Sequence, residues 1–443
     1  MHEKYGHVVR VGPNRLSFSS LEDSFAIYGF NKCIEKGNFY DFARDRSKNL
    51  ENVFCARTEA AHRDKRRKMF RTAFSNEKVV AYDPVVVKNV DLLRSRILSQ
   101  LDRQDGDDNV FNIVQLCHRF VIDSILEIVL GSNVCPQPWT DRPTTSGLPK
   151  ELKFASKLSG AIPIFPWLSR LLTSPWVISR LRKPTRNAAG EPTNFAAISA
   201  ASHALAFEHP ELASQSPQQS VVKYWLRVPI DDSRKMGPYE LWNEASNIVF
   251  AGQGSTAGAL ITTIFMLGSQ EGREWQKRIR LEAHDFSVVP GPTALFPPIL
   301  LAVIKETLRL YPPLPFSFPR TIVVGGENAI PNLSAPVPAG TEVSVNPYVI
   351  GRSREIWGPT ANEWLPERWL GERREVSLDD KLMVFSKGSR SCMGRELAML
   401  MLARAVVSIV SRWEIKSVGQ PKGRFFLDMA YDDCSISFND LSF

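Results

Sequence analysis

The chain has 443 residues, of which 43% are hydrophobic and 23% charged, an ordinary globular composition with enough apolar material for a large core. Its net charge of +8 raises nucleic acid or an anionic surface as partners. The basic residues are dispersed, however, apart from short clusters at residues 63–68 and 180–186. Short basic runs are usually solvated, so we expect no nucleic-acid binding, whereas contact with a membrane surface stays compatible with the charge.

The cysteines and histidines restrict the kinds of metal site. The six cysteines contain no CxxC pair, which argues against a disulfide framework or a zinc site and favours a reducing compartment. The seven histidines show no HxxH or HExxH spacing. If the chain binds a metal, the arrangement that remains is a lone cysteine together with a prosthetic group.

The elements predicted first along the chain are two short strands, at residues 7–11 and 15–18, joined by a Gly-Pro-Asn turn. From residue 85 to residue 131, apolar residues recur at three- and four-residue intervals, which predicts helix. Residues 132–240 are less regular, with an amphipathic piece at 195–207. The helical pattern resumes at residue 239, and further helices are expected at 271–283, 298–310 and 394–413.

The remaining β-structure is expected to be short. Strands are predicted at 321–324 and 341–345, a loop-rich segment leads to residue 387, and alternation returns at 434–438. No repeat, low-complexity tract or linker marks a domain boundary. The sequence therefore predicts a mainly α fold with small β-sheets, built as a single unit.

The uncharged run at residues 245–270 is long enough to cross a membrane. Its first half contains Asn247, Gln253, Ser255, Thr256 and two glycines, so its mean apolarity is modest. A buried central helix therefore fits this run better than a membrane span.

The strongest chemical signal is the segment FSKGSRSCMG at 385–394, on a loop that enters a predicted helix. Gly388 and Gly394 bracket Cys392 and let the backbone approach a flat ligand closely. A cysteine just before a helix is held as thiolate by the amide groups and the positive end of the helix dipole. Arg390 can reach a carboxylate with a forked hydrogen bond. With Phe385, this makes five fixed positions in ten residues.

This segment resembles the haem-binding signature FxxGxRxCxG of the cytochromes P450, the family in which a cysteine thiolate holds haem iron. The resemblance implies haem b as the cofactor, Cys392 as the axial ligand of its iron, and Arg390 as a propionate contact. Phe385, Gly388 and Gly394 match the remaining signature positions.

Two further segments follow the family's order. KETLR at 305–309 resembles its ExxR helix, and PERW at 366–369 resembles its PERF segment. Glu306 and Arg309 lie one helical turn apart and so share a face. By resemblance, Glu306, Arg309 and Arg368 form a buried charge network that positions the cysteine loop. We expect this role to be structural, because breaking a buried pair costs about 3–5 kcal/mol.

An upstream basic segment, HRDKRR at 62–67, resembles the helix that donates a basic group to a haem propionate. Counting from His62 favours Arg66 as that group, and counting back from Phe74 favours Arg67. Arg320, which follows the ExxR helix, resembles another propionate contact.

The oxygen-activating helix of the family reads A-G-x-acid-alcohol, and the match here begins at Ala251 and ends at Thr256. Gly254 stands in place of the acid, and Ser255 keeps the hydroxyl on the face of Ala251. Glycines at Gly252 and Gly254 predict a local bulge and room for a water molecule that would relay protons. Provided that the new charge finds a partner and does not simply raise its own pKa, we expect Gly254→Asp to leave the coupling of NADPH use to product formation equal or better.

The resemblance runs from near residue 4 to the C-terminus and implies one catalytic domain over residues 1–443, starting after the family's usual membrane anchor. Haem is expected between the long uncharged helix and the Cys392 loop. The implied activity is monooxygenation of a lipophilic small molecule, with electrons from NADPH through a separate reductase at the cytosolic face of the endoplasmic reticulum membrane. Sequence segments such as GRSREIWG are most similar to those of fungal members of the family, many of which act in secondary metabolism.

Two other outcomes stay open from the sequence. A haem-thiolate isomerase, dehydratase or peroxide-using enzyme would fit the missing acid at Gly254. A catalytically inactive haem-binding protein, or a truncated product, would fit a sequence that starts after the family's membrane anchor. For the substrate, the segment 315–318 (PFSF) indicates an apolar, aromatic pocket wall.

Overall fold

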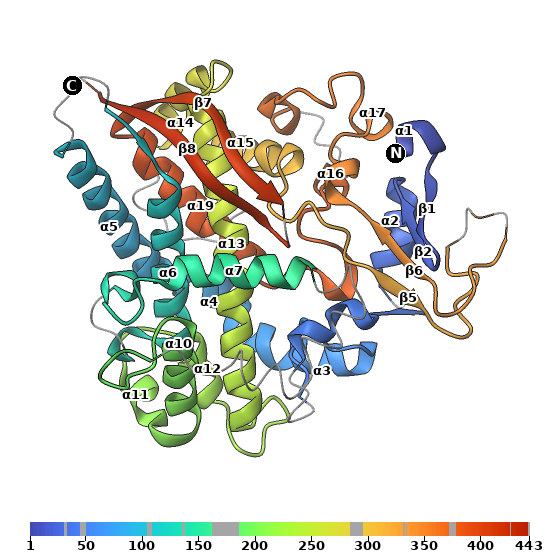
Figure 1. Ribbon diagram of the computed structural model, residues 1–443, viewed down its shortest axis with the longest axis horizontal. Helices are drawn as coiled ribbons and strands as arrows, with labels where there is room; N and C mark the ends of the chain where they lie inside the picture. Colours follow the sequence, from blue (N-terminus) through green and yellow to red (C-terminus); the bar gives the residue numbers. More distant parts are fainter. Residues whose placement is uncertain are drawn as a thin grey trace. The chain divides into compact units, whose positions relative to one another are not determined.

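The structure is a computed structural model that describes residues 1–30, 33–44, 50–103, 109–134, 138–161, 186–283, 296–330, 333, 335–371, 378–425 and 427–441. The chain forms two compact units. Unit 1 comprises residues 1–66 and 305–393, and unit 2 comprises residues 67–304 and 394–443 (Figure 1). Most of the basic cluster at 180–186 lies outside the described residues.

Unit 1 is built on a five-stranded sheet in the order β1-β2-β6-β5-β3. The strands are β1 (Val8–Gly12), β2 (Arg15–Phe18), β3 (Ile34–Glu35), β5 (Arg320–Ile322) and β6 (Glu342–Val345). β2 runs parallel to β6, whereas the other pairs are antiparallel. The strands predicted at 7–11, 15–18, 321–324 and 341–345 are thus confirmed within one or two residues.

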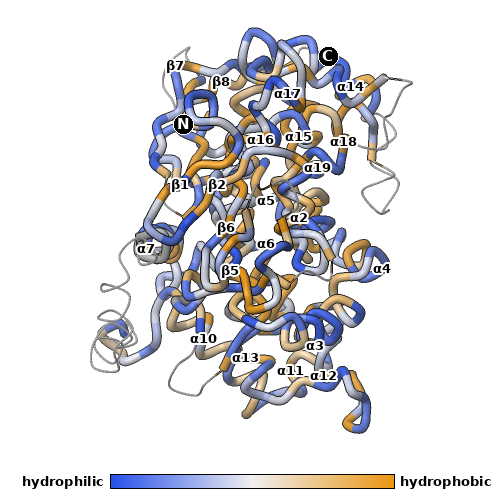
Figure 2. Tube along the Cα trace, turned by 90° about the vertical axis from the view of Figure 1, so that its right-hand side faces the viewer, coloured by the Kyte–Doolittle hydropathy of each residue, from blue (hydrophilic) through white to orange (hydrophobic). Residues whose placement is uncertain are grey.

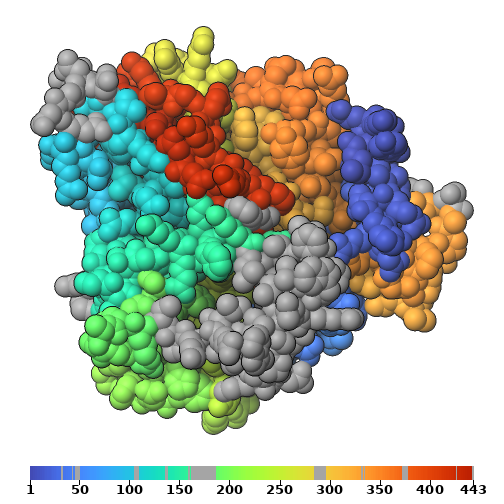
Figure 3. All heavy atoms as spheres, in the orientation of Figure 1, coloured from blue at the N-terminus to red at the C-terminus, as the bar shows by residue number. Residues whose placement is uncertain are grey.

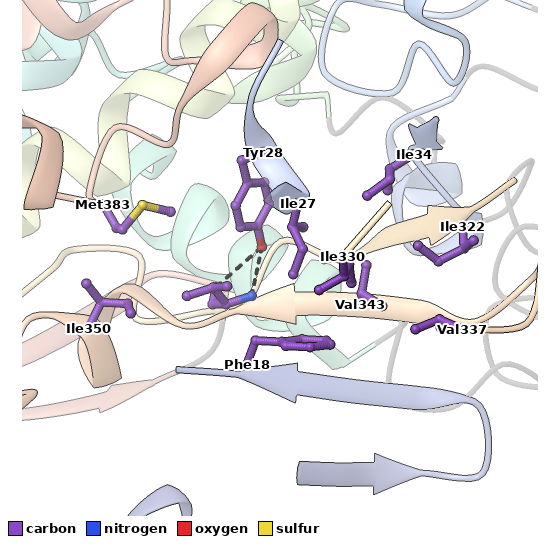
Figure 4. Close-up of a cluster of buried hydrophobic side chains, with 11 residues drawn as sticks. Phe18, Ile27, Tyr28, Ile34, Ile322, Ile330, Val337, Val343, Ile350 and Met383 are labelled. Atoms are coloured by element: carbon purple, nitrogen blue, oxygen red, sulfur yellow. Dashed lines mark hydrogen bonds between the residues drawn. The ribbon is translucent and has the colours of Figure 1, made fainter. Parts of the chain in front are cut away.

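The core of unit 1 packs α2 (Leu21–Tyr28) against this sheet. Ile27 and Tyr28 meet Phe18 and Val343 in a buried cluster (Figure 4). The Tyr28 hydroxyl accepts a hydrogen bond from the backbone N–H of Val345 at 3.1 Å and so ties the helix to β6. Ser20 caps α2 by accepting from Asp23 N at 3.0 Å, which satisfies one of the free amides at the helix start.

The other helices of unit 1 are short, and two longer ones cross into unit 2. The short ones are α1 (His2–Tyr5), α16 (Pro347–Ile350), α17 (Arg354–Trp357) and α18 (Leu378–Lys381). The two that cross are α3 (Glu59–Met69) and α15 (Pro298–Leu310). Figure 2 colours α3 mainly as hydrophilic, in keeping with its basic sequence.

Unit 2 is mainly helical. Its helices are α4 (Asn76–Val80), α5 (Asp83–Leu101), α6 (Val114–Leu130), α7 (Leu148–Ala161), α10 (Phe195–His203), α11 (Pro210–Gln215), α12 (Val221–Leu226), α13 (Pro238–Gly268), α14 (Arg273–Glu282) and α19 (Arg395–Val410). These helices agree with the periodicity-based predictions except within 85–131, where the strand β4 (Val110–Asn112) separates α5 from α6. The amphipathic piece at 195–207 is α10, which continues as a π-helical turn at Ala204–Glu208.

The predicted central helix is α13, which is one continuous α-helix of 31 residues. Pro238 lies at its first turn, where the missing N–H costs nothing. Among the described residues, α13 is the one helix long and apolar enough to cross a membrane by length and composition, and 67% of its apolar window is buried. Its burial confirms the prediction of a buried core helix.

A three-stranded sheet in the order β4-β8-β7 completes unit 2. Its strands are β4 (Val110–Asn112), β7 (Trp413–Phe425) and β8 (Met429–Asp440). The β7–β8 hairpin lies at the surface, red in Figure 3, beside the cyan segment that includes β4. It is anchored to α13 by Ser417, whose hydroxyl donates to Phe265 O at 2.6 Å. The sequence predicted the end of β8 but not the length of this hairpin.

Candidate functional site

The cysteine loop of unit 1 is shaped by tight backbone contacts. The backbone N–H of Cys392 donates to Phe385 O at 2.8 Å, which closes the loop. Gly388 has φ +66°, and a Cβ there would overlap the carbonyl of Tyr28. Only glycine fits this position without strain. The loop leaves Cys392 exposed, and Gly394 is the N-cap of α19 two positions later in the sequence.

Arg390 is fixed by the segment before α3. Its Nη1 donates to Ala56 O and its Nη2 to Arg57 O, both at 2.7 Å, and its Nε lies 3.2 Å from a carboxylate oxygen of Glu59. Burial lowers the pKa of Arg390, the neighbouring Arg320 charge lowers it further, and Glu59 raises it. Two guanidinium groups therefore lie close together in unit 1.

Arg320 is 4% exposed, yet its hydrogen-bond partners are all neutral. Its Nη1 donates to the Tyr40 hydroxyl at 2.5 Å and to Pro319 O at 3.1 Å, and its guanidinium lies 4.9 Å from the centre of the Tyr28 ring. Within the described part of the chain, Arg320 forms no ion pair. A buried cation beside a second cation is costly unless an anion compensates for it. The arrangement therefore fits a ligand that carries carboxylates.

His62 and Arg66 contact the cysteine loop from α3. The His62 ring nitrogens lie 3.1 Å from Val53 O and 3.2 Å from Ser389 O. Burial lowers the pKa of His62 to about 3, and the charges of Lys36 and Arg390 act in the same direction. Arg66 donates to Ser391 O at 2.6 Å.

Arg67 has different contacts from those of Arg66. It donates to the Ser233 hydroxyl at 2.6 Å and to Ser233 O at 3.0 Å, both within unit 2. Burial lowers the pKa of Arg66, whereas the nearby Cys392 raises it. Of the two arginines left open by the sequence, Arg66 is the one beside the cysteine loop.

The structure brings together the three charged residues of the predicted network. Glu306 is fully buried and accepts from Arg309 Nε at 2.8 Å and Nη2 at 2.7 Å. Arg368 Nε lies 3.2 Å from the same carboxylate, and Trp369 Nε1 and Leu365 N donate to it at 3.0 and 2.9 Å. Arg309 and Arg368 also donate to backbone carbonyls, so the network ties α15 to the segment 351–369.

In unit 2, Ser255 and Ala251 share one face of α13, because the Ser255 hydroxyl donates to Ala251 O at 2.9 Å. Thr256 is buried. A Cβ on Gly252 would lie 2.7 Å from Cδ1 of Ile125 in α6, so this glycine permits close packing of the two helices. The predicted bulge is wrong, because α13 stays α-helical through both glycines.

The space beside Gly254 is occupied by a carboxyl group that the sequence did not reveal. A Cβ on Gly254 would overlap Oδ2 of Asp428, from the turn between β7 and β8. The predicted room for water at this glycine is therefore wrong. A side chain introduced by Gly254→Asp would meet this carboxyl, and its effect on coupling stays a prediction. No motif marks Asp428 in the sequence.

A family model for cytochrome P450 matches residues 1–428. The chain belongs to the cytochrome P450 family. It is 27% identical over 441 residues to cicH, a cytochrome P450 monooxygenase of Emericella nidulans, covering 97% of this chain and 84% of that protein. It is 25% identical to pisatin demethylase of Fusarium vanettenii, covering 94% and 78%. It is 24% identical to mpaDE' of Penicillium brevicompactum, of which it spans about half, 49%.

This cytochrome P450 is an oxidoreductase with the mainly helical fold of its family, and the family implies haem as the cofactor. The residues present fit that group. Haem carries two carboxylates, and buried Arg320 beside Arg390 is the kind of site that carboxylates would neutralise. The exposed Cys392 offers one sulfur ligand, and Gly388 keeps its loop tight.

Proposed function

We propose that this cytochrome P450 is a monooxygenase that hydroxylates or otherwise oxidises a lipophilic small molecule, with residues 1–443 acting as one catalytic domain. The balanced reaction takes RH, O₂, NADPH and H⁺ to ROH, H₂O and NADP⁺. The single observation that carries the proposal is the exposed Cys392 on a loop of unit 1, whose Arg390 lies beside the buried Arg320 of β5.

In this proposal Cys392 binds the haem iron as thiolate. Arg390, Arg320 and Arg66 hold the propionates, and His62 supports them from α3. Once bound, haem supplies the iron that activates oxygen, helped by electron donation from the thiolate. Phe385, Gly388 and Gly394 shape the loop.

On α13, we assign proton transfer to the Ser255 hydroxyl, whose hydrogen bond to Ala251 O fixes its orientation. Thr256 is buried and Gly252 packs against Ile125, so these two residues position the helix.

The lipophilic substrate class is supported by a half-buried aromatic cluster in unit 1. Phe316 stacks on Phe39 with ring centres 5.0 Å apart, and Phe318 meets Phe39 and Phe54 edge to face at 6.4 and 6.2 Å. Such rings favour apolar ligands. Because the similar proteins come from fungi, we propose a fungal secondary metabolite as substrate.

Electrons are proposed to come from NADPH through a separate reductase, since the chain has no GxGxxG fingerprint. Exposed Arg63 and Arg67 on α3 provide a basic surface for docking. We place the enzyme at the cytosolic face of the endoplasmic reticulum membrane.

The test uses haem-loaded protein, a P450 reductase and a panel of fatty acids, terpenoids and aromatic polyketides. The panel member that gives the largest substrate-induced absorbance shift is then incubated with and without NADPH and O₂. Product that requires both is the expected result. Product formed without oxygen would overturn the proposal in favour of an isomerase or dehydratase, and product formed with peroxide alone would favour a peroxide-using enzyme.

A further inference from the structure

Gly254 stands where the family has an acid, and a carboxyl group nevertheless lies beside it. A Cβ built on Gly254 would lie 3.1 Å from Cγ of Asp428 and would overlap its Oδ2. The Asp428 carboxyl therefore takes up the space into which an acidic side chain at position 254 would extend. Gly254 allows this approach, since a larger side chain there would force the carboxyl to shift.

Asp428 is held in this place by α7. β7 ends at Phe425 and β8 begins at Met429, so Asp428 lies in the turn. The Ser156 hydroxyl of α7 donates to Asp428 Oδ1, and both residues are buried. One turn earlier in α7, Lys153 donates to Tyr431 O at 2.8 Å and to Asp432 Oδ1 at 2.5 Å. Two polar links thus hold the end of the hairpin against α7.

The surroundings of Asp428 favour its protonated form. Within the described residues it forms no ion pair, unlike Asp432, which pairs with Lys153 at 2.5 Å. Burial raises the pKa of Asp428, and the Ser156 hydrogen bond and the Lys153 charge offset this only in part. A buried carboxyl that retains its proton can act as a general acid.

We propose that Asp428 supplies, from the β7–β8 turn, the carboxyl that α13 lacks at Gly254, and that it passes protons towards the Ser255 hydroxyl. This inference rests on the proposed monooxygenase function. In each transfer the Asp428 O–H bond breaks and a proton moves towards Ser255. A proton from solvent then restores the carboxyl, so that its charge is unchanged over a turnover. The protons leave in the water of the balanced reaction.

The first test concerns placement and needs no activity. Gly254→Ala should lower the unfolding temperature by several degrees, because the added methyl meets Asp428. In an Asp428→Gly background the same substitution should cost nothing or stabilise the helix. Gly252→Ala is the matched control, because its obstacle is Ile125, and Asp428→Gly should leave its effect unchanged. Equal effects of Gly254→Ala in both backgrounds would overturn the placement.

The second test measures coupling, the fraction of consumed NADPH that appears as product, with the panel member of largest absorbance shift. Asp428→Asn keeps the size of the side chain and its hydrogen bond to Ser156, so the unfolding temperature should hold. Because Asn cannot release a proton, coupling should fall about ten-fold or more. Asp433→Asn, on β8 but outside the links to α7, is the control and should keep the wild-type coupling, since among the described residues its carboxylate bonds only the Ser435 hydroxyl of its own strand.

A relocation variant completes the test. Gly254→Asp combined with Asp428→Gly moves the carboxyl onto α13 and should restore most of the coupling lost in Asp428→Asn. Unchanged coupling in Asp428→Asn would mean that the residue is only a tether, which overturns the inference while the proposed function stands. Absence of NADPH-dependent oxidation by the wild-type chain would instead overturn the proposed function, and the inference with it.

Discussion

The Glu306 carboxylate offers the sharpest test of how unit 1 is stabilised. It is fully buried and accepts five hydrogen bonds, from Arg309, Arg368, Trp369 and the backbone of Leu365. Glu306→Gln preserves the shape but replaces one acceptor oxygen by an amide donor. In either orientation of the side-chain amide, its NH₂ group faces at least two hydrogen-bond donors. The Arg309 guanidinium also loses its buried counter-charge.

Removing one partner of a buried ion pair costs about 3–5 kcal/mol. For a cooperative unit of roughly 150–250 residues, each kcal/mol lowers the unfolding temperature by about 2–4 °C, so we expect a fall of about 6–20 °C. Glu306→Ala should be worse and should yield little haem-loaded protein, because Arg309 and Arg368 then lack any carboxylate in their network.

The assay is thermal unfolding followed by circular dichroism, together with the haem absorbance of the purified protein. Glu363→Gln is the matched control, because its side chain is exposed and only its backbone carbonyl, which accepts from Arg309, joins the network. A Glu306→Gln variant that unfolds at the wild-type temperature and retains haem normally would refute the structural role. So would one that merely turns over slowly while it keeps wild-type stability.

Three further outcomes are expected. Cys392→Ala should abolish the thiolate-type absorption band of the reduced carbon monoxide adduct, whereas the exposed Cys33 can be replaced by Ala without effect on it; an unchanged band in Cys392→Ala would contradict the ligand assignment. Arg66→Met should weaken haem retention by about 10–100-fold, as loss of a charged hydrogen bond does, and Arg67→Met should not. The reverse pattern in a haem-transfer assay would assign the propionate contact to Arg67. Because the pKa of His62 is lowered to about 3, its contribution to stability is complete above about pH 6.5 and is lost as the pH falls towards 3. The loss approaches about 1.4 kcal/mol per pH unit only below about pH 5.5, so His62→Gln should remove about that much of the acid-induced loss between about pH 5.5 and 4.5 in chemical unfolding, and an unchanged pH slope would be evidence against a neutral buried ring.

Much of the site could be predicted because its residues are close in sequence. The spacing of Arg390 and Cys392 is set by one loop, and the pairing of Glu306 with Arg309 is set by one helical turn. The strands at 7–11 and 15–18 follow from alternation and a turn. These are local regularities, and the structure keeps them within a residue or two.

The choice between Arg66 and Arg67 needed three-dimensional information. Adjacent helical residues point about 100° apart, so the two side chains necessarily meet different partners, Ser391 and Ser233. A motif with one residue of uncertainty in its register cannot decide between them. The bulge predicted at the two glycines fails for a related reason. Glycine weakens an isolated helix, but close packing of Ile125 on Gly252 compensates for that weakness.

Asp428 shows why an acid that is missing from a motif does not show that the site lacks one. Position 254 and position 428 are distant in sequence, and only the end of β8 was expected from alternation. The carboxyl reaches α13 because the hairpin is long and because Ser156 and Lys153 hold its turn on α7. The absence of a side chain at Gly254 and the position of the Asp428 carboxyl therefore belong together, since a larger residue at 254 would force that carboxyl to shift. This reverses the expectation for Gly254→Asp alone. Two carboxyl groups forced together would clash and raise each other's pKa, so the single variant should be less stable and less well coupled than the wild type, whereas the relocation variant should be neither.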